Sequence, residues 1–188
     1  MSGRASPSFA ILVTSMLLNA CAPTTYKAGP PNVDPSLTDT HLTAADGAKL
    51  PIRKWLPENS APKAVLLAMH GFNDYSNAFY LPAPFWAKQG IITYAYDQRG
   101  FGGAPHRGFW PGTKTLTADL RTAVAAISKR HTGIPVYVLG VSMGGAVVMA
   151  TLAEGPIEAI DGAILAAPAV WGRTHMNIFQ CAALWLAY

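Results

Sequence analysis

The chain has 188 residues, enough for one domain with a substantial core. Hydrophobic residues make up 51% of the chain and charged residues 13%, a balance that excludes an intrinsically disordered protein. The formal net charge of +4 is spread along the sequence, with no run of more than two basic residues, so no nucleic-acid partner is expected. The two cysteines, Cys21 and Cys181, exclude a disulfide scaffold and a zinc-type cysteine cluster, and neither a metal nor a cofactor is expected.

The first 21 residues have the pattern of a bacterial export signal. Arg4 gives a positive start, and the apolar run from Phe9 to Leu18 is too short to span a bilayer. The ending Leu18-Asn19-Ala20-Cys21 resembles the lipobox of bacterial lipoproteins, in which the cysteine is lipidated and becomes the first mature residue. The resemblance implies a membrane anchor on Cys21, and Ala22 favours the outer membrane facing the periplasm. An ordinary secretory signal, with Cys21 merely present, is the alternative.

Composition divides the rest of the chain into three segments. Residues 21–39 contain four prolines and little apolar periodicity, which predicts a semi-extended tether after the signal peptide of residues 1–20. The folded domain is expected over residues 40–170, beginning near Thr40. Residues 171–188 form a separate C-terminal segment.

Strand and helix patterns alternate through the folded domain. An antiparallel hairpin is expected from His41–Thr43 and Leu50–Trp55, on either side of an Asp46-Gly47 turn. Strands separated by helices imply a parallel sheet with right-handed crossovers, so the expected fold class is α/β. The other expected strands are 64–69, 91–96, 136–141 and 163–166, and the expected helices are 76–88, interrupted or delayed by Pro82 and Pro84, then 115–130 and 143–153.

A G-x-S-x-G sequence lies between an apolar strand and a helix. Ser142 is its serine, and the flanking Gly140 and Gly144 let the strand and helix backbones approach closely. This strand–turn–helix context is typical of a nucleophile elbow, which exposes the serine at the carboxyl edge of a parallel sheet. A tight turn followed by a helix N-cap serine is the structural alternative.

Two more loops are expected at the same edge of the sheet. The sequence His70-Gly71-Phe72 follows the strand 64–69, and a developing oxyanion needs backbone N–H donors held in place. We expect Phe72 and Met143 to supply these donors and His70 to organise the loop. In the second loop, after the strand 91–96, Asp97 and Arg99 are expected to form an ion pair that fixes the loop, and a catalytic role is the alternative.

Taken together, three sequences resemble the α/β-hydrolase family, and within it the monoacylglycerol lipase and lysophospholipase group. They are H-G-F at 70–72, D-Q-R-G-F-G at 97–102 and G-V-S-M-G-G at 140–145. The resemblance implies a serine hydrolase acting on lipid or small carboxylic esters through an acyl-serine intermediate, with Ser142 as the nucleophile. It also implies that the triad follows the chain order serine, acid, histidine, which argues against His70 as the base.

The sequence departs from the family pattern after the serine. The family's acid and histidine follow later strands, whereas this sequence stops 46 residues beyond Ser142. The uncharged stretch 176–188 matches the place where the family begins its lid, and a buried helix is the alternative. The sequence is therefore expected to be the N-terminal part of an α/β-hydrolase without its C-terminal strands.

Asp161 and His175 have the right chain order to complete a triad with Ser142. Asp161, however, comes just before the strand 163–166 and is expected at the amino end of the sheet, about 17–20 Å from the serine. We therefore expect a turn role for Asp161, a lid-base role for His175, and no complete triad within these residues. A non-catalytic envelope lipoprotein and another chemistry on the same fold, such as a peptidase, haloperoxidase or acyltransferase, remain alternatives.

Overall fold

The computed structural model describes residues 24–58, 60–170 and 176–186. Within these ranges, seven strands form one sheet in the order β1-β2-β3-β5-β4-β6-β7. β4 to β7 are parallel to one another, and β1, β2 and β3 are joined to them by antiparallel pairings. The strands are β1 Ser36–Leu37, β2 His41–Thr43, β3 Lys49–Trp55, β4 Ala64–Met69, β5 Ile91–Tyr96, β6 Val136–Val141 and β7 Gly162–Ala166.

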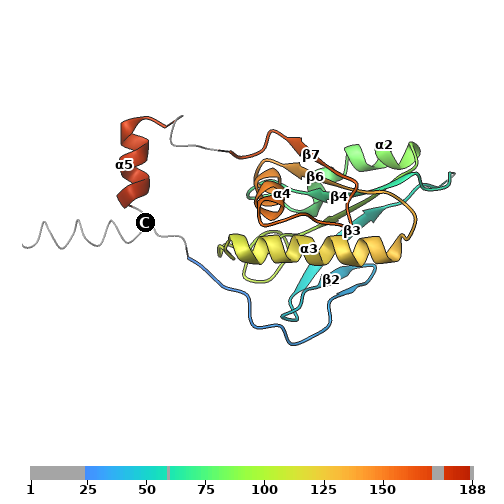
Figure 1. The fold of residues 1–188 in the computed structure, drawn as a ribbon, viewed down its shortest axis with the longest axis horizontal. Helices are drawn as coiled ribbons and strands as arrows, with labels where there is room; N and C mark the ends of the chain where they lie inside the picture. Colours follow the sequence, from blue (N-terminus) through green and yellow to red (C-terminus); the bar gives the residue numbers. More distant parts are fainter. Residues whose placement is uncertain (1–23, 59, 171–175, 187–188) are drawn as a thin grey trace, which may run out of the picture. The chain divides into compact units, whose positions relative to one another are not determined.

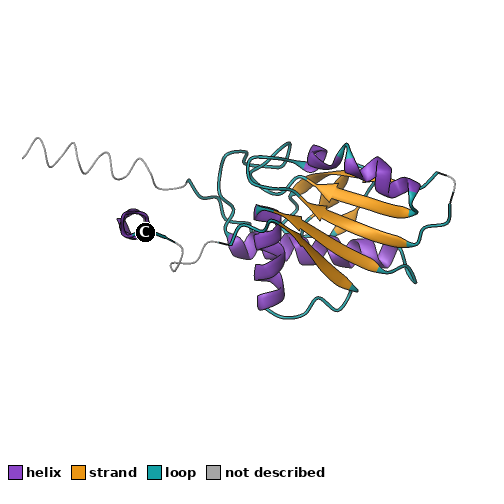
Figure 2. Cartoon of the chain, turned by 90° about the horizontal axis from the view of Figure 1, so that it is seen from above, coloured by secondary structure: helices purple, strands orange, loops and turns teal. Residues whose placement is uncertain are grey.

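Helices alternate with the parallel strands, which confirms the expected α/β class (Figures 1 and 2). They are the 3-10 helix η1 Ser76–Phe79, then α2 Pro82–Lys88, α3 Thr113–Arg130, α4 Met143–Ala153 and α5 Ile178–Leu186. The sheet and the first four helices belong to one compact unit, Thr25–Ala169, and α5 lies in a separate unit. No helix in the described ranges is both long and apolar enough to cross a bilayer.

The central strands are buried on both faces, as their continuous apolar sequences predict. In β4, Val65, Leu67 and Met69 belong to the core that contains the buried residues of α3 and α4. The alternate residues Leu66 and Ala68 pack in a second core with η1 and α2. The helices thus cover both faces of the sheet, with α3 and α4 on one side and α2 on the other (Figure 1).

Helix α3 buries the apolar face that its sequence predicts. Leu116, Leu120, Ala123, Val124 and Ile127 recur at helical spacing, and all five are buried. The helix begins at Thr113, two residues before the expected start, directly after Gly112 with a φ of 82°. That left-handed conformation cannot continue a right-handed helix and suits glycine, so it sets the boundary.

The residues expected as a tether make several contacts with the domain. β1 pairs with β2 before Thr40, so regular pairing begins earlier than the expected start of the folded domain. The Tyr26 N–H donates to the Trp110 carbonyl at 3.0 Å, and the Tyr26 ring stacks on His106 with ring centroids 3.3 Å apart. The expected signal peptide and Cys21 lie outside the described residues.

Candidate active site

In the described part of the chain, the non-glycine residues with left-handed backbone angles lie at one edge of the sheet. The four non-glycine residues with left-handed φ angles are Asn73, His106, Ser142 and Ala167, at 57°, 58°, 50° and 44°. They lie in the segments that follow the carboxyl ends of β4, β5, β6 and β7 respectively. Because strained backbone persists where function requires it, this carboxyl edge is the candidate active site.

Ser142 occupies a sharp turn between β6 and α4, with φ 50° and ψ −115°. Its N–H donates to the Ala166 carbonyl at 3.1 Å, so the strained residue is tied to the end of β7. A Cβ atom on Gly140 would lie 2.7 Å from the Gly144 carbonyl oxygen, and one on Gly144 would overlap the Met69 carbonyl. Only glycine fits at both positions, as the elbow interpretation requires.

The loop after β4 lies directly beside Ser142. A Cβ atom on Gly71 would be 3.4 Å from Ser142 Cβ and 3.9 Å from Ser142 Oγ. The next residue, Phe72, is 69% exposed, and its ring packs edge-on against Phe101 with centroids 5.4 Å apart. Met143 directly follows the serine and is the first residue of α4, so its N–H has no acceptor within the helix. The two expected donors thus belong to the residues that directly follow Gly71 and Ser142 in the sequence.

His70 is fully buried and bonded to two backbone groups. Its Nδ1 lies 2.8 Å from the Gly71 carbonyl oxygen, and its Nε2 lies 2.9 Å from the Gln98 N–H nitrogen. The Gln98 side chain donates back to the His70 carbonyl at 2.8 Å. Burial lowers the pKa of His70. The sequence interpretation did not single out Gln98, since no motif rule assigns a role to its position.

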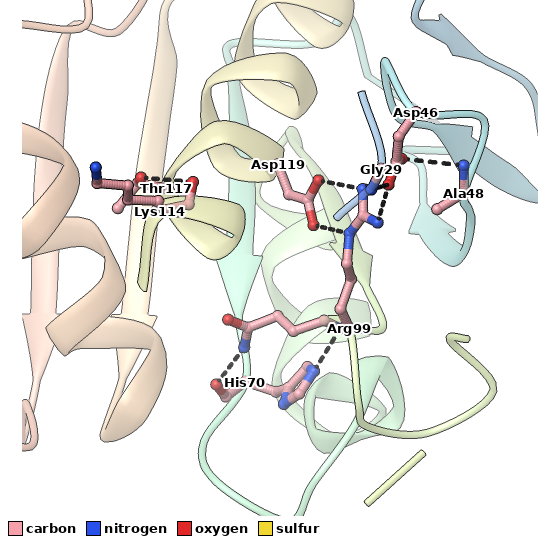
Figure 3. A network of polar contacts seen from close by, with 9 residues as sticks. Gly29, Asp46, Ala48, His70, Arg99, Lys114, Thr117 and Asp119 are labelled. Atoms are coloured by element: carbon pink, nitrogen blue, oxygen red, sulfur yellow. Dashed lines mark hydrogen bonds and ion pairs between the residues drawn. The ribbon is translucent and has the colours of Figure 1, made fainter. Parts of the chain in front are cut away.

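The expected ion pair between Asp97 and Arg99 is wrong. Arg99 instead makes bidentate contacts with two other carboxylates (Figure 3): 2.7 and 2.9 Å to Asp119, and 2.6 and 2.8 Å to Asp46. Hydrogen bonds from Arg99 lower the pKa of Asp46 to about 2. The five N–H donors of a guanidinium match two carboxylates, which come here from the β2–β3 hairpin and from α3.

Asp97 bonds to backbone groups. Its two carboxylate oxygens accept hydrogen bonds from the N–H groups of Ser76 and Gly103, each at 2.8 Å. Asp97 therefore ties the start of η1 to the loop after β5, and Arg99 ties the same loop to the hairpin and α3. Both residues fix loops at the carboxyl edge, although with different partners from those expected.

Asp161 lies at the opposite end of β6 from Ser142. Its carboxylate accepts a hydrogen bond from the Val136 N–H at 2.8 Å, and its own N–H donates to the Val136 carbonyl at 2.7 Å. Val136 opens β6 and Ser142 follows its last residue, a separation of about 20 Å at the usual rise of a strand. The expected turn position of Asp161 is confirmed, and His175 lies outside the described residues. Those residues also contain no cluster of three or more potential metal ligands.

The family follows from a comparison with known sequences. A family model described as serine aminopeptidase, S33, matches residues 60–188. The chain belongs to this family of α/β-hydrolases. The matched region includes the Ser142 elbow and the loops that carry His70, Asp97 and Arg99, so the family match and the strained carboxyl edge concern the same residues.

Two lipases are among the individual proteins that the chain resembles in sequence. Human monoglyceride lipase is 32% identical over 131 residues, which cover 69% of this chain and 43% of the relative. The monoacylglycerol lipase of Mycolicibacterium smegmatis is 28% identical over 73% of this chain and 49% of its own length. The α/β-hydrolase chain thus spans about half the length of these relatives.

Solved structures give the same fold. A soluble variant of monoglyceride lipase from Saccharomyces cerevisiae, in complex with a substrate analogue, matches with a TM-score of 0.59 and 26% identity over 78% of this chain and 48% of that one. A thermostable carboxyl esterase from Bacillus coagulans matches with a TM-score of 0.60 at 20% identity, over 69% and 44% of the two chains. At that identity, the esterase supports the fold alone.

Proposed function

We propose that this protein is a serine hydrolase of carboxylic esters, with a monoacylglycerol or lysophospholipid as the substrate class. The observation that carries the proposal is the strained Ser142 turn beside Gly71, with 3.4 Å between Ser142 Cβ and the place of a Gly71 Cβ. The likeness to the human and mycobacterial lipases supports the ester and lipid assignment.

The geometry suits acyl transfer through a covalent intermediate. Ser142 Oγ attacks the ester carbonyl carbon, a histidine takes the serine proton, and the Phe72 and Met143 N–H groups bind the oxyanion. Collapse of the tetrahedral intermediate expels the alcohol, which receives that proton, and water then releases the acid from the acyl-serine. Asp161 is not the acid that orients the histidine, because its carboxylate bonds to Val136 at the far end of β6.

Substrate assays test the proposed reaction. The protein expressed from its own gene is expected to release fatty acid from a monoacylglycerol or a lysophospholipid and to leave an aminoacyl p-nitroanilide intact. Titration of released fatty acid measures the first activity, and absorbance of released nitroaniline measures the second. Cleavage of the anilide alone would assign a peptidase. No turnover of either, together with no reaction with a fluorophosphonate, would favour the non-catalytic lipoprotein.

We also propose that the protein is a lipoprotein of the bacterial envelope, anchored through Cys21. The sequence Leu18-Asn19-Ala20-Cys21 after an apolar run supports this. Expressed with its leader in a bacterium, the protein is expected to incorporate radiolabelled palmitate, and Cys21→Ser is expected to lose the label. Cys181→Ser is the matched control and should keep it. A wild-type product without label, recovered in the soluble fraction, would reject the anchor.

A further inference from the structure

A buried polar network connects the expected oxyanion loop to the body of the domain (Figure 3). Arg99 binds Asp46 and Asp119, and the adjacent Gln98 bonds twice to His70. His70 in turn bonds to Gly71, the residue beside Ser142. We propose that Gln98 and a neutral His70 form a latch that positions the Gly71–Phe72 backbone for catalysis at Ser142. The catalytic part of this proposal rests on the proposed function.

The hydrogen bonds of the latch admit one protonation state of His70. The Gln98 backbone N–H can only donate, so His70 Nε2, 2.9 Å away, must be a bare acceptor. The Gly71 carbonyl can only accept, so His70 Nδ1, 2.8 Å away, must carry the hydrogen. Both requirements are met by the neutral Nδ1–H tautomer, whereas an imidazolium would lose the bond from Gln98.

The surroundings of His70 favour this neutral state. Burial is the largest influence and lowers the pKa of His70, while the hydrogen bond to Gly71 and the nearby carboxylates Asp97 and Asp74 act in the opposite direction. Each is engaged by backbone N–H groups, Asp97 at Ser76 and Gly103, and Asp74 at Tyr75. The His70 ring also packs in a T-shaped arrangement with the apolar Phe101 ring, with centroids 5.8 Å apart.

Gln98 is fixed from both sides along the chain. Asp97, directly before it, accepts hydrogen bonds from the N–H groups of Ser76 and Gly103. Arg99, directly after it, binds the carboxylates of Asp46 and Asp119. The Gln98 backbone N–H is therefore held in place to meet His70 Nε2. Its fully buried side-chain amide adds the second bond, from Nε2 to the His70 carbonyl at 2.8 Å. A loop tied at these points is pre-organised, which is what oxyanion donors require.

The tautomer of His70 can be measured without any activity. The full chain labelled with ¹⁵N-histidine is expected to show His70 as the Nδ1–H tautomer in ring-nitrogen NMR spectra, with no titration at the ordinary histidine value of about 6.5. His70→Asn assigns the signal by removing it. An Nε2–H tautomer, or an imidazolium at neutral pH, would overturn the latch.

The positioning role is tested at Ser142 with Gln98→Met, which keeps the side-chain volume and removes the side-chain donor to the His70 carbonyl. The backbone donor from residue 98 to His70 Nε2 stays. In the protein expressed from its own gene, we expect the maximal rate of fluorophosphonate labelling to fall about 10- to 100-fold, with little change in the half-saturating probe concentration. Thr151→Val removes another buried hydrogen bond, from Thr151 Oγ1 to the Val147 carbonyl, away from the carboxyl edge. It controls for general destabilisation and should label at the wild-type rate.

The possible outcomes separate the two proposals. An unchanged labelling rate in Gln98→Met, or an equal loss in Thr151→Val, overturns the positioning role. A wild-type protein, expressed from its own gene, that takes no label overturns the proposed function and the catalytic consequence of the latch with it. The NMR result decides the latch itself in either case.

Discussion

Ser142→Ala is expected to abolish covalent labelling by a fluorophosphonate in the protein expressed from its own gene. The reagent reacts with a serine Oγ that a neighbouring base has activated, and alanine removes that atom. Intact-mass measurement before and after reaction counts the adduct, and peptide mapping locates it. Ester hydrolysis should fall with it by several orders of magnitude, since the acyl-serine cannot form.

Two further variants test whether the loss of label is specific to the Ser142 side chain. Ser128→Ala makes the same chemical change in α3 and should keep full labelling. Ser142→Gly should also lose the label, yet it should unfold at a higher temperature than Ser142→Ala. Glycine relieves the strain at φ 50°, a difference of about 1 kcal/mol in unfolding free energy. Label that persists in either variant at position 142 would place the nucleophile elsewhere.

The strands and α4 could be predicted closely because their signals are local. β4, β5 and β6 are continuous apolar runs that end at polar or glycine-containing loops, and their bounds agree with the expectation. α4 is bounded by the Ser142 turn, and α2 begins at Pro82, which suits the first turn of a helix. The start of α3 was missed by two residues, since the conformation of Gly112 could not be read from its neighbours.

The partners of the loop residues could not be predicted, because they depend on tertiary contacts. The sequence around Asp46 predicts only a hairpin turn, and Asp119 is one polar residue within a predicted helix. Nothing in their spacing from Arg99, 53 and 20 residues away, indicates that they meet around it. Only Gln98 separates Asp97 from Arg99 in the sequence, so an ion pair between them is the simplest prediction. In the structure Asp97 accepts hydrogen bonds from backbone N–H groups, and Arg99 binds two other carboxylates.

The largest effect on stability is expected from Arg99→Met. The variant leaves the carboxylates of Asp46 and Asp119 without their cation, although their side chains are only 9% and 4% exposed. Breaking a buried ion pair by removing one partner costs about 3–5 kcal/mol, because an uncompensated charge stays buried. Denaturant unfolding followed by circular dichroism measures the loss.

Matched variants separate charge from packing. The triple variant Arg99→Met/Asp46→Asn/Asp119→Asn removes all three charges and should recover much of the stability lost in Arg99→Met. Lys54→Met breaks an exposed pair, in which the Asp39 side chain is 71% exposed, and should change the unfolding free energy little. Equal losses in Arg99→Met and the triple variant would assign the effect to packing of the arginine side chain.

The loss of unfolding free energy in Arg99→Met is expected to depend on pH. In the wild-type protein, Asp46 has a folded pKa of about 2, lowered by Arg99 from 3.8, so it stabilises the fold by about 2 kcal/mol above pH 4. That contribution is lost as the pH falls from about 4 to 2, because the unfolded state then binds the proton first. Arg99 also acts to lower the pKa of Asp119, but burial of that carboxyl has the larger effect and raises its pKa above the ordinary value. Without Arg99 both carboxyls lose this lowering, so the deficit of Arg99→Met should be largest at neutral pH and shrink as the pH falls. A deficit independent of pH would contradict the ion network.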